Sequence, residues 1–276
     1  MPKISDLPQD FLGQITRSIL NHSVALIRIR KGKTSDDIQL IGSGTFVHVE
    51  DTFGILTAHH VLEAIPAKGT LGIILPYHDK EHRYTIDISH ITKIPIARGK
   101  VDSDGPDIAF IKLPQTYIGQ IKAHATFYNL EHNKEEVINI PVDNNIGMWA
   151  ISGYPDEYKK EIESIGCFDG IIKYEGNCLF GSIDKCYSSG EFDYIEMPAD
   201  YQNDVPKSFG GVSGGGLWHI VLEQPPQGNI RVKCIVFSGV AFYQSALEND
   251  FRSLKCHGRR SVYRIASNRI RDLSQS

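Results

Sequence analysis

The sequence predicts an all-β fold, a barrel or a sandwich, with a helix at each end. Short runs rich in valine and isoleucine recur along the chain, and these residues favour strands. Glycine, proline, asparagine or aspartate separates most of the runs, as is typical of tight connections. Helical patterns do not alternate regularly with the strand patterns, so a parallel α/β sheet is not expected.

The bulk composition is that of one large globular domain or two small ones. The chain has 276 residues, of which 41% are hydrophobic and 22% charged, close to the globular average. The formal net charge of −4 gives no electrostatic reason to expect nucleic acid or an anionic membrane as partner. No run approaches the roughly 20 apolar residues of a membrane-spanning helix, and the first residues lack the pattern of a signal peptide.

The cysteines form no pattern of a disulfide framework, a zinc site or a C-x-x-C redox motif. The five are Cys167, Cys178, Cys186, Cys234 and Cys256. An odd number cannot all pair within one chain, and free thiols are typical of reducing compartments. We therefore expect a cytoplasmic protein.

The first part of the chain predicts a helix followed by strands. Within residues 7–20 the apolar side chains recur at helical spacing. We expect this helix to pack against the sheets, with docking of a partner as a second hypothesis. Residues 23–30 predict a strand, and residues 38–49 return as its partner after a polar turn. Further strands are expected at residues 54–58, 71–75, 84–88, 91–96 and 108–113.

Residues 119–136, a polar stretch without clean periodicity, predict a linker between two β halves. The linker would separate a first unit, residues 23–118, from a second, residues 137–276, with residues 1–22 as an N-terminal helical extension. Residues 261–273 repeat apolar side chains at helical spacing and are expected to close the fold as a helix. Strands of the second unit are expected at residues 137–140, 148–152, 170–174, 194–197, 217–222 and 231–237.

Three short patterns carry the residue types that acyl transfer needs. The run Leu-Thr-Ala leads into His59 and His60, Asp107 opens an apolar strand, and Ser213 lies in the run Gly-Gly-Val-Ser-Gly-Gly-Gly. A serine hydroxyl needs a base to take its proton, a neutral imidazole does so near pH 7, and a carboxylate fixes the imidazole tautomer. Glycines let backbone N–H groups turn toward an oxyanion. Each pattern alone is common in structural roles, but together they predict a serine hydrolase.

These segments resemble those of the trypsin-like (chymotrypsin-fold) serine peptidases, particularly the bacterial intracellular type. The landmarks of that family read Leu-Thr-Ala-Ala-His, Asp-Ile-Ala-Leu and Gly-Asp-Ser-Gly-Gly. The resemblance covers most of the chain and includes Ile-Ser-Gly-Tyr-Pro from Ile151 and Ser-Val-Tyr from Ser261. It implies two antiparallel six-stranded β-barrels with the active site in the cleft between them.

By this resemblance, His60 would be the general base, Asp107 would orient it, and Ser213 would be the nucleophile that forms an acyl-enzyme. The backbone N–H groups of Gly211 and Ser213 would form the oxyanion hole. The protein would be a serine endopeptidase that acts on polypeptides and needs neither a cofactor nor a metal ion. His59 is expected to be structural.

The resemblance also suggests where a substrate side chain would bind. At the position of the family's pocket floor is Lys207, followed by Ser208. A buried ammonium would favour an acidic side chain, so cleavage after Glu or Asp is a hypothesis. The alternative is that Lys207 lies in solvent. The expected pocket wall, Ser238, Gly239 and Val240, lacks the histidine that glutamyl peptidases use.

Three other functions fit parts of the pattern. The run around Ser213 also fits the G-x-S-x-G elbow of α/β-hydrolases, but the residues after it make a better strand than a helix. A metal site at His59 and His60 is disfavoured because neighbours on a strand face opposite sides. A catalytically silent module of the same fold, which binds or senses a partner, is the third. An active enzyme would need restraint by a regulatory protein, a narrow substrate range or a distorted resting site.

Overall fold

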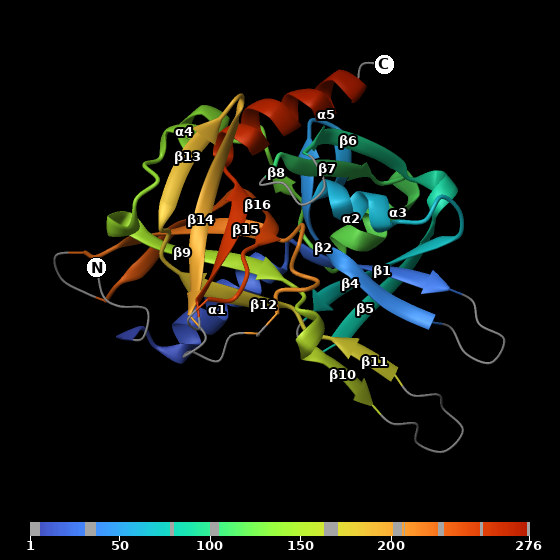
Figure 1. The fold of residues 1–276 in the computed structure, drawn as a ribbon, viewed down its shortest axis with the longest axis horizontal. Coiled ribbons are helices and arrows are strands. Elements are labelled where there is room, and N and C mark those ends of the chain that lie inside the picture. The colour runs from blue at the N-terminus through green and yellow to red at the C-terminus, as the bar shows by residue number, and fades with distance from the viewer. Residues whose placement is uncertain are drawn as a thin grey trace.

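Two mainly antiparallel sheets, one in each half of the chain, make up most of the structure (Figure 1). The structure is a computed structural model, and it describes residues 6–30, 37–77, 80–99, 105–162, 171–200, 206, 208–225, 229–248 and 251–274. Within these residues the strands form an eight-stranded sheet, a seven-stranded sheet and a two-stranded ribbon. The all-β class with helices at both ends is confirmed, although the strand numbers differ from the expected six per unit.

The first sheet has the strand order β5-β4-β1-β2-β3-β7-β6, and β8 pairs in parallel with β2. Its strands are β1 (Ser23–Arg30), β2 (Asp37–Val49), β3 (Thr52–Thr57), β4 (Thr70–Tyr77), β5 (Lys80–Asp87), β6 (Thr92–Arg98), β7 (Asp107–Lys112) and β8 (Tyr128–Asn129). Strand β1 has hydrogen-bonded neighbours on both sides. Its first five residues, from Ser23 to Ile27, are all buried, which explains why Val24 to Ile27 are apolar without alternation.

The second sheet has the strand order β12-β9-β15-β16-β17-β14-β13. Its strands are β9 (Gly147–Gly153), β12 (Asn177–Gly181), β13 (Lys185–Ser189), β14 (Phe192–Asp200), β15 (Gly216–Glu223), β16 (Arg231–Gln244) and β17 (Phe251–His257). The separate ribbon consists of β10 (Lys159–Ile162) and β11 (Ile171–Tyr174), and it projects from the body of the molecule in Figure 1. Strand β16 extends well beyond the expected end at residue 237.

The N-terminal helix α1 (Gln9–Leu20) packs against the second sheet, as Figure 1 shows. Ile15 and Ile19 are 2% and 0% exposed, and the backbone at Gly176 lies against the Leu20 side chain. Packing is therefore the role that the structure shows for this helix. None of the described helices combines the length and the apolarity needed to cross a lipid bilayer.

The other helices are short and lie at connections. They are α2 (His59–Ala64), α3 (Gln115–Lys122), α4 (Lys134–Asn139), and a π-helical turn (Ser261–Ala266) continued by α5 (Ser267–Ser274). Three 3-10 turns complete the described elements, at Ile88–His90, Asn144–Ile146 and Asp156–Tyr158. The closing helix agrees with the pattern of residues 261–273.

The strand expected at residues 137–140 is wrong, because most of that segment belongs to α4. Asn133 adopts a left-handed φ of 51° before the helix, which turns the chain. Glu135 and Glu136 follow in the first helical turn, where carboxylates are favourable. The expected linker, residues 119–136, holds the end of α3, strand β8 and the start of α4.

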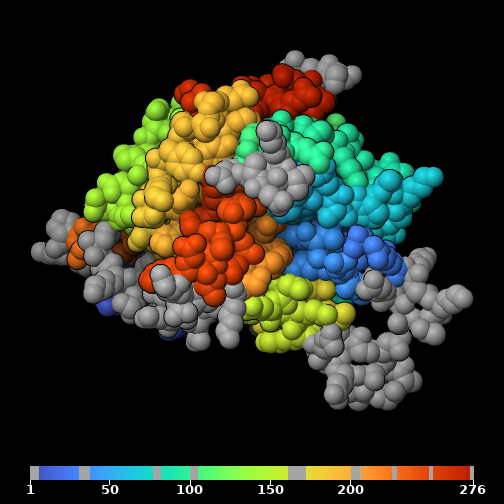
Figure 2. All heavy atoms as spheres, in the orientation of Figure 1, coloured from blue at the N-terminus to red at the C-terminus, as the bar shows by residue number. Residues whose placement is uncertain are grey.

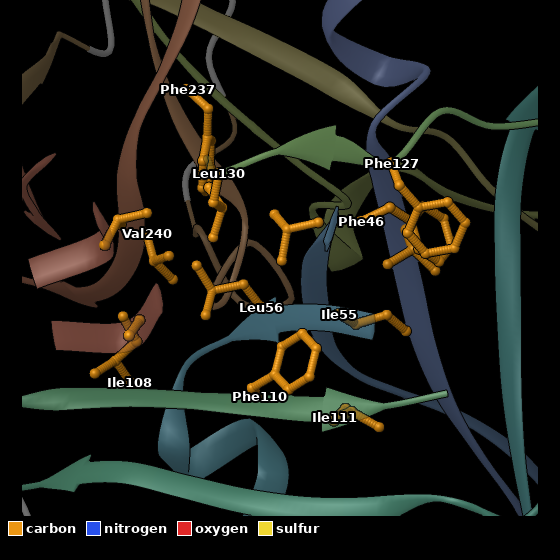
Figure 3. Packing of buried hydrophobic residues seen from close by; sticks show 14 of the residues in the cluster. Phe46, Ile55, Leu56, Ile108, Phe110, Ile111, Phe127, Leu130, Phe237 and Val240 are labelled. Atoms are coloured by element: carbon orange, nitrogen blue, oxygen red, sulfur yellow. The ribbon is translucent and has the colours of Figure 1, made fainter. Parts of the chain in front are cut away.

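Side chains of both sheets share one hydrophobic core. Figure 3 shows Leu56 of β3 and Ile108 of β7 beside Val240 and Phe237 of β16. All four side chains are fully buried. The shared core holds the two sheets against each other, so residues at the ends of β3, β7 and β16 keep fixed relative positions.

Candidate active site

His60 and Asp107 meet because β3 and β7 are antiparallel neighbours, with Thr57 paired to Ala109. The end of β3 therefore lies beside the start of β7, where Asp107 is the first residue. The chain turns into α2 after β3, which places His60 over the aspartate. The Nδ1 atom of His60 lies 2.6 Å from Oδ2 of Asp107, and the backbone N–H of His60 donates to Oδ1 at 3.0 Å.

The two hydrogen bonds between Asp107 and His60 keep Asp107 ionised and determine which ring nitrogen of His60 carries the proton. Burial by itself would raise the pKa of Asp107, but the hydrogen bonds and the charge of His60 outweigh burial and lower it. The ionised carboxylate accepts at Nδ1, so the Nδ1–H tautomer is favoured and Nε2 keeps its lone pair. The His60 side chain is 47% exposed. It can therefore act as a base toward a group in solvent.

His257 supports Asp107 from behind and was not foreseen from the sequence. Its Nε2 accepts the backbone N–H of Asp107 at 2.9 Å, and the rings of Phe192, Tyr194 and Phe242 surround it. Burial lowers the pKa of His257 to about 4. The strand that carries it, β17, reads Phe-Arg-Ser-Leu-Lys-Cys-His, which has no regular alternation that would predict a strand.

His219 is a second buried neutral histidine. Its ring stacks on Trp149 at 4.2 Å, and its Nδ1 lies 2.8 Å from Nη2 of Arg259. Burial and the charge of Arg259 lower the pKa of His219 to about 3. Its Nδ1 accepts from the guanidinium, which only a neutral ring can do.

We expect the free energy of unfolding to fall as the pH drops from 6.5 toward 4. The unfolded chain binds protons at His219 and His257 in this range and the folded chain does not, so acid favours unfolding. Each histidine contributes at most about 1.4 kcal/mol per pH unit. Urea unfolding at several pH values measures the slope. His257→Gln should reduce it, and an unchanged slope in that variant would contradict the assignment.

The loop that carries Ser213 belongs to the second half of the chain but is held by β2 of the first. The Ser43 N–H donates to the carbonyl of Ser213 at 2.8 Å, and Ser43 Oγ donates to the carbonyl of Gly211 at 2.6 Å. Thr57, three residues before His60, donates through Oγ1 to the Ser43 carbonyl at 2.7 Å. On the face drawn in Figure 2, the orange surface of this half adjoins the blue surface of β1 and β2.

Gly42 lies between the two parts of the site. A methyl group placed there would be 2.6 Å from Val61 Cγ2 and 3.0 Å from the carbonyl oxygen of Ser213. The helix with His60 and the loop with Ser213 thus approach the same point of β2. Among the described residues, the Ser213 hydroxyl forms no hydrogen bond with the His60 ring; such contacts often tighten only when a substrate binds.

The backbone N–H groups expected to form the oxyanion hole donate no hydrogen bond within the described part of the chain. The N–H groups of Gly211 and Ser213 donate to none of the described residues, whereas those of Val212 and Gly214 donate to Phe209 and Ala241. Gly211 has a φ of +87°, and a methyl group there would lie 2.4 Å from the Tyr154 carbonyl. Glycine is required at this position for both reasons.

Of the expected substrate-binding residues, Ser208 is the one placed on the Ser213 loop. Its N–H donates to Oε1 of Glu157 at 2.9 Å, and its hydroxyl accepts the N–H of Gly210 at 3.2 Å. Lys207 lies outside the described residues, so its expected position remains a prediction.

The structure does not bring Ser238, Gly239 and Val240 to the groove beside Ser213. Ser238 is fully buried and accepts from Arg259 Nε at 3.0 Å, and Val240 packs in the shared core (Figure 3). The reason is the greater length of β16, whose later residues reach the site. The groove is lined by Phe209, Val212, Ser213, Ala241, Phe242, Tyr243, Gln244 and Leu254.

His59 is buried, with a residue exposure of 7%, and its Nδ1 lies 3.8 Å from Oε2 of Glu63. It begins α2 rather than ending a strand, so the strand geometry used to judge a metal site does not apply. No group of three or more His, Cys, Asp or Glu side chains is placed to hold a metal ion in the described part of the chain. The four described cysteines, Cys178, Cys186, Cys234 and Cys256, are free thiols.

Comparisons with known proteins find similar structures but no similar sequences. No protein-family model matches the chain, and no curated protein does. The drosophila Grass clip serine protease of the Toll pathway is 16% identical with a TM-score of 0.49, over 90% of this chain and 70% of that one. The tobacco vein mottling virus protease is 11% identical with a TM-score of 0.42, over 92% and 82% of the chains. Likeness at this level does not identify catalytic residues.

Proposed function

We propose that the protein is a serine endopeptidase in which His60, Asp107 and Ser213 act together. The observation that carries the proposal is the double contact of Asp107 with His60, 2.6 Å at Nδ1 and 3.0 Å at the backbone N–H. It leaves Nε2 as a base, and the contacts of Ser43 hold the Ser213 loop close by. Unused N–H groups at Gly211 and Ser213 supply what an oxyanion requires.

In the proposed first half-reaction, Ser213 Oγ attacks the carbonyl carbon of a peptide bond while its proton passes to Nε2 of His60. The resulting oxyanion would accept from the N–H groups of Gly211 and Ser213; each such donor typically contributes about 2.7–4 kcal/mol. The C–N bond then breaks, His60 gives its proton to the leaving amine, and an acyl-enzyme remains. Water attacks the ester with His60 as base, which releases the acid and restores the hydroxyl of Ser213.

A catalytically silent module that binds a partner is the second candidate. One observation favours it, namely that the Ser213 hydroxyl and the His60 ring form no hydrogen bond among the described residues. A peptidase must form this contact before it can cleave a peptide bond, whereas a binding module need not form it. This difference separates the two candidates. Cytoplasmic location and control by a regulatory protein stay predictions.

Labelling with a fluorophosphonate probe tests the proposal. The wild-type protein should be labelled covalently and Ser213→Ala should not, because the probe captures an activated serine. Ser188→Ala, which changes an exposed serine of β13 away from the loop, should remain labelled. Absence of labelling in the folded wild-type protein would support the silent module instead.

A further inference from the structure

The hydroxyl of Ser43 lies between the end of β9 and the loop that carries Ser213. We propose that Ser43 is a positioning residue, whose hydroxyl keeps the backbone N–H groups of Gly211 and Ser213 in the orientation that binds the oxyanion. This inference rests on the proposed function, because it concerns how the same site is held ready. Ser43 itself touches no reacting atom in this proposal and acts through the loop.

The loop begins with a tight turn whose third residue is Gly211. The N–H of Val212 donates to the carbonyl of Phe209 at 3.0 Å, and Gly211 has a left-handed φ of +87°. A turn with these two features is of type II. Types I and II differ by the rotation of their central peptide group, which here joins Gly210 to Gly211. The direction of the Gly211 N–H therefore depends on how this peptide group is held.

Hydrogen bonds to carbonyl groups orient the two N–H groups of the loop. The carbonyl in the same peptide group as the Gly211 N–H accepts from the N–H of Asp156 at 2.8 Å. The carbonyl in the same peptide group as the Ser213 N–H accepts from the N–H of Gly215, also at 2.8 Å. In a trans peptide group the N–H points opposite to the C=O. The N–H of Gly211 thus points away from Asp156, and that of Ser213 points away from Gly215.

Ser43 holds the peptide group that lies between these two. Its Oγ donates to the carbonyl of Gly211 at 2.6 Å and accepts the backbone N–H of Tyr154 at 2.9 Å. A carbonyl only accepts and a backbone N–H only donates, so both roles of the hydroxyl are fixed. The peptide group held in this way joins Gly211 to Val212. Its rotation would change ψ of Gly211 and φ of Val212, and would tilt the N–H groups on both sides.

Ser43 is fixed in the sheet that also carries His60 and Asp107. It pairs with Ala25 of β1, and its carbonyl accepts from Thr57 Oγ1 at 2.7 Å. Its side chain is fully buried, so solvent does not compete for the bonds of its hydroxyl. The hydroxyl thus ties the orientation of the loop to the sheet that holds the base.

Loss of the Ser43 hydroxyl should affect the transition state more than substrate binding. Among the described residues, no other group donates to the Gly211 carbonyl. Without the hydroxyl this carbonyl and the Tyr154 N–H lose their partner, and the peptide group between them is free to rotate. The oxyanion exists only after the attack on the substrate carbonyl. Misaligned N–H donors should therefore lower kcat and leave KM nearly unchanged.

The test measures peptide cleavage and inhibition by a peptide boronic acid in Ser43→Ala. Boron bonds to Ser213 Oγ as the hydroxyl proton passes to His60, and the tetrahedral adduct carries an oxygen where the oxyanion would lie. We expect kcat to fall about tenfold or more, since losing a donor outright costs about 10²–10³-fold. The inhibition constant of the boronic acid should rise by the same factor, and that of an uncleavable peptide should not change.

Ser267→Ala is the matched control. Ser267 is a buried serine of α5 whose hydroxyl donates to Oε1 of Glu131 at 2.5 Å and accepts from Nζ of Lys134 at 3.4 Å. This variant also removes a buried hydroxyl with two partners, so it should lose stability in urea without a change in kcat or in boronic acid inhibition. Ser43→Cys keeps a weak donor and acceptor and should recover part of the loss.

Failure of the inference and failure of the proposed function give different results. A folded Ser43→Ala protein with the kcat and boronic acid inhibition of an active wild type would overturn the positioning role and leave the peptidase intact. If Ser43→Ala does not fold, wild-type values in Ser43→Cys would overturn it equally. A folded wild-type protein that neither reacts with the fluorophosphonate probe nor cleaves any peptide would overturn the proposed function, and the positioning role with it.

Discussion

Asp107→Asn should lower kcat by about 10⁴-fold with little change in stability. The backbone N–H of His60 donates to Oδ1 of Asp107, so in the variant the amide oxygen must take that place. The amide NH₂ group then faces Nδ1 of His60, where it can only donate. The imidazole has to adopt the Nε2–H tautomer, and the lone pair that would take the proton of Ser213 is lost.

Initial rates on a cleavable peptide measure this effect, and thermal unfolding shows whether the variant is folded. Asp51→Asn, the same change at an exposed turn, serves as the control and should retain full activity. A base in the wrong tautomer should retain far less than a tenth of the wild-type activity. If Asp107→Asn kept more than about a tenth of it, the role assigned to the pair would be wrong.

Gly214→Ala should destabilise the fold and abolish labelling at Ser213. Gly214 has a φ of +87°, and a methyl group there would lie 2.1 Å from both the Ser43 carbonyl and Thr57 Oγ1. A left-handed residue with a side chain costs about 1–2 kcal/mol, and overpacking costs about 1–3 kcal/mol. We expect a loss of about 2–5 kcal/mol in the free energy of unfolding, because the clash lies where the two sheets meet.

Gly210→Ala is the matched control on the same loop. A methyl group there would meet only Ser208 Oγ, at 3.4 Å, and Gly210 does not have a left-handed φ. Urea unfolding should place this variant within about 0.5 kcal/mol of the wild type, as for most substitutions away from strained positions. A Gly214→Ala protein as stable as Gly210→Ala would show that the loop tolerates a shift of β2.

Local sequence patterns predicted the strands better than the irregular segments. Valine and isoleucine runs bounded by turn residues located β1, β2, β7, β9 and β15, because side-chain periodicity reports directly on a pleated, half-buried backbone. The strand prediction at residues 137–140 is wrong because its three β-branched residues are a weak signal beside an acidic first helical turn and the left-handed Asn133. Tertiary context decides such short segments.

For the site, the sequence located His60 and Asp107, which the structure brings into contact, but not the residues that line the groove. Ser238, Gly239 and Val240 were expected there, whereas the structure uses Ala241 to Gln244. The pairing of β16 with β17 shifts by one residue, and no local pattern records this shift. His257 and Asp107 are 150 residues apart in the sequence, so no local pattern could predict their contact.

The Ser213 loop is positioned by contacts that form as the chain folds. Ser43 holds two carbonyl groups of the loop, and Val212, 5% exposed, packs in an apolar cluster of the second sheet. Val212 is uncharged, so its place in this cluster depends on packing and not on an ion pair. The backbone that carries Ser213 therefore reaches its position when the two sheets pack together, before any ligand is present.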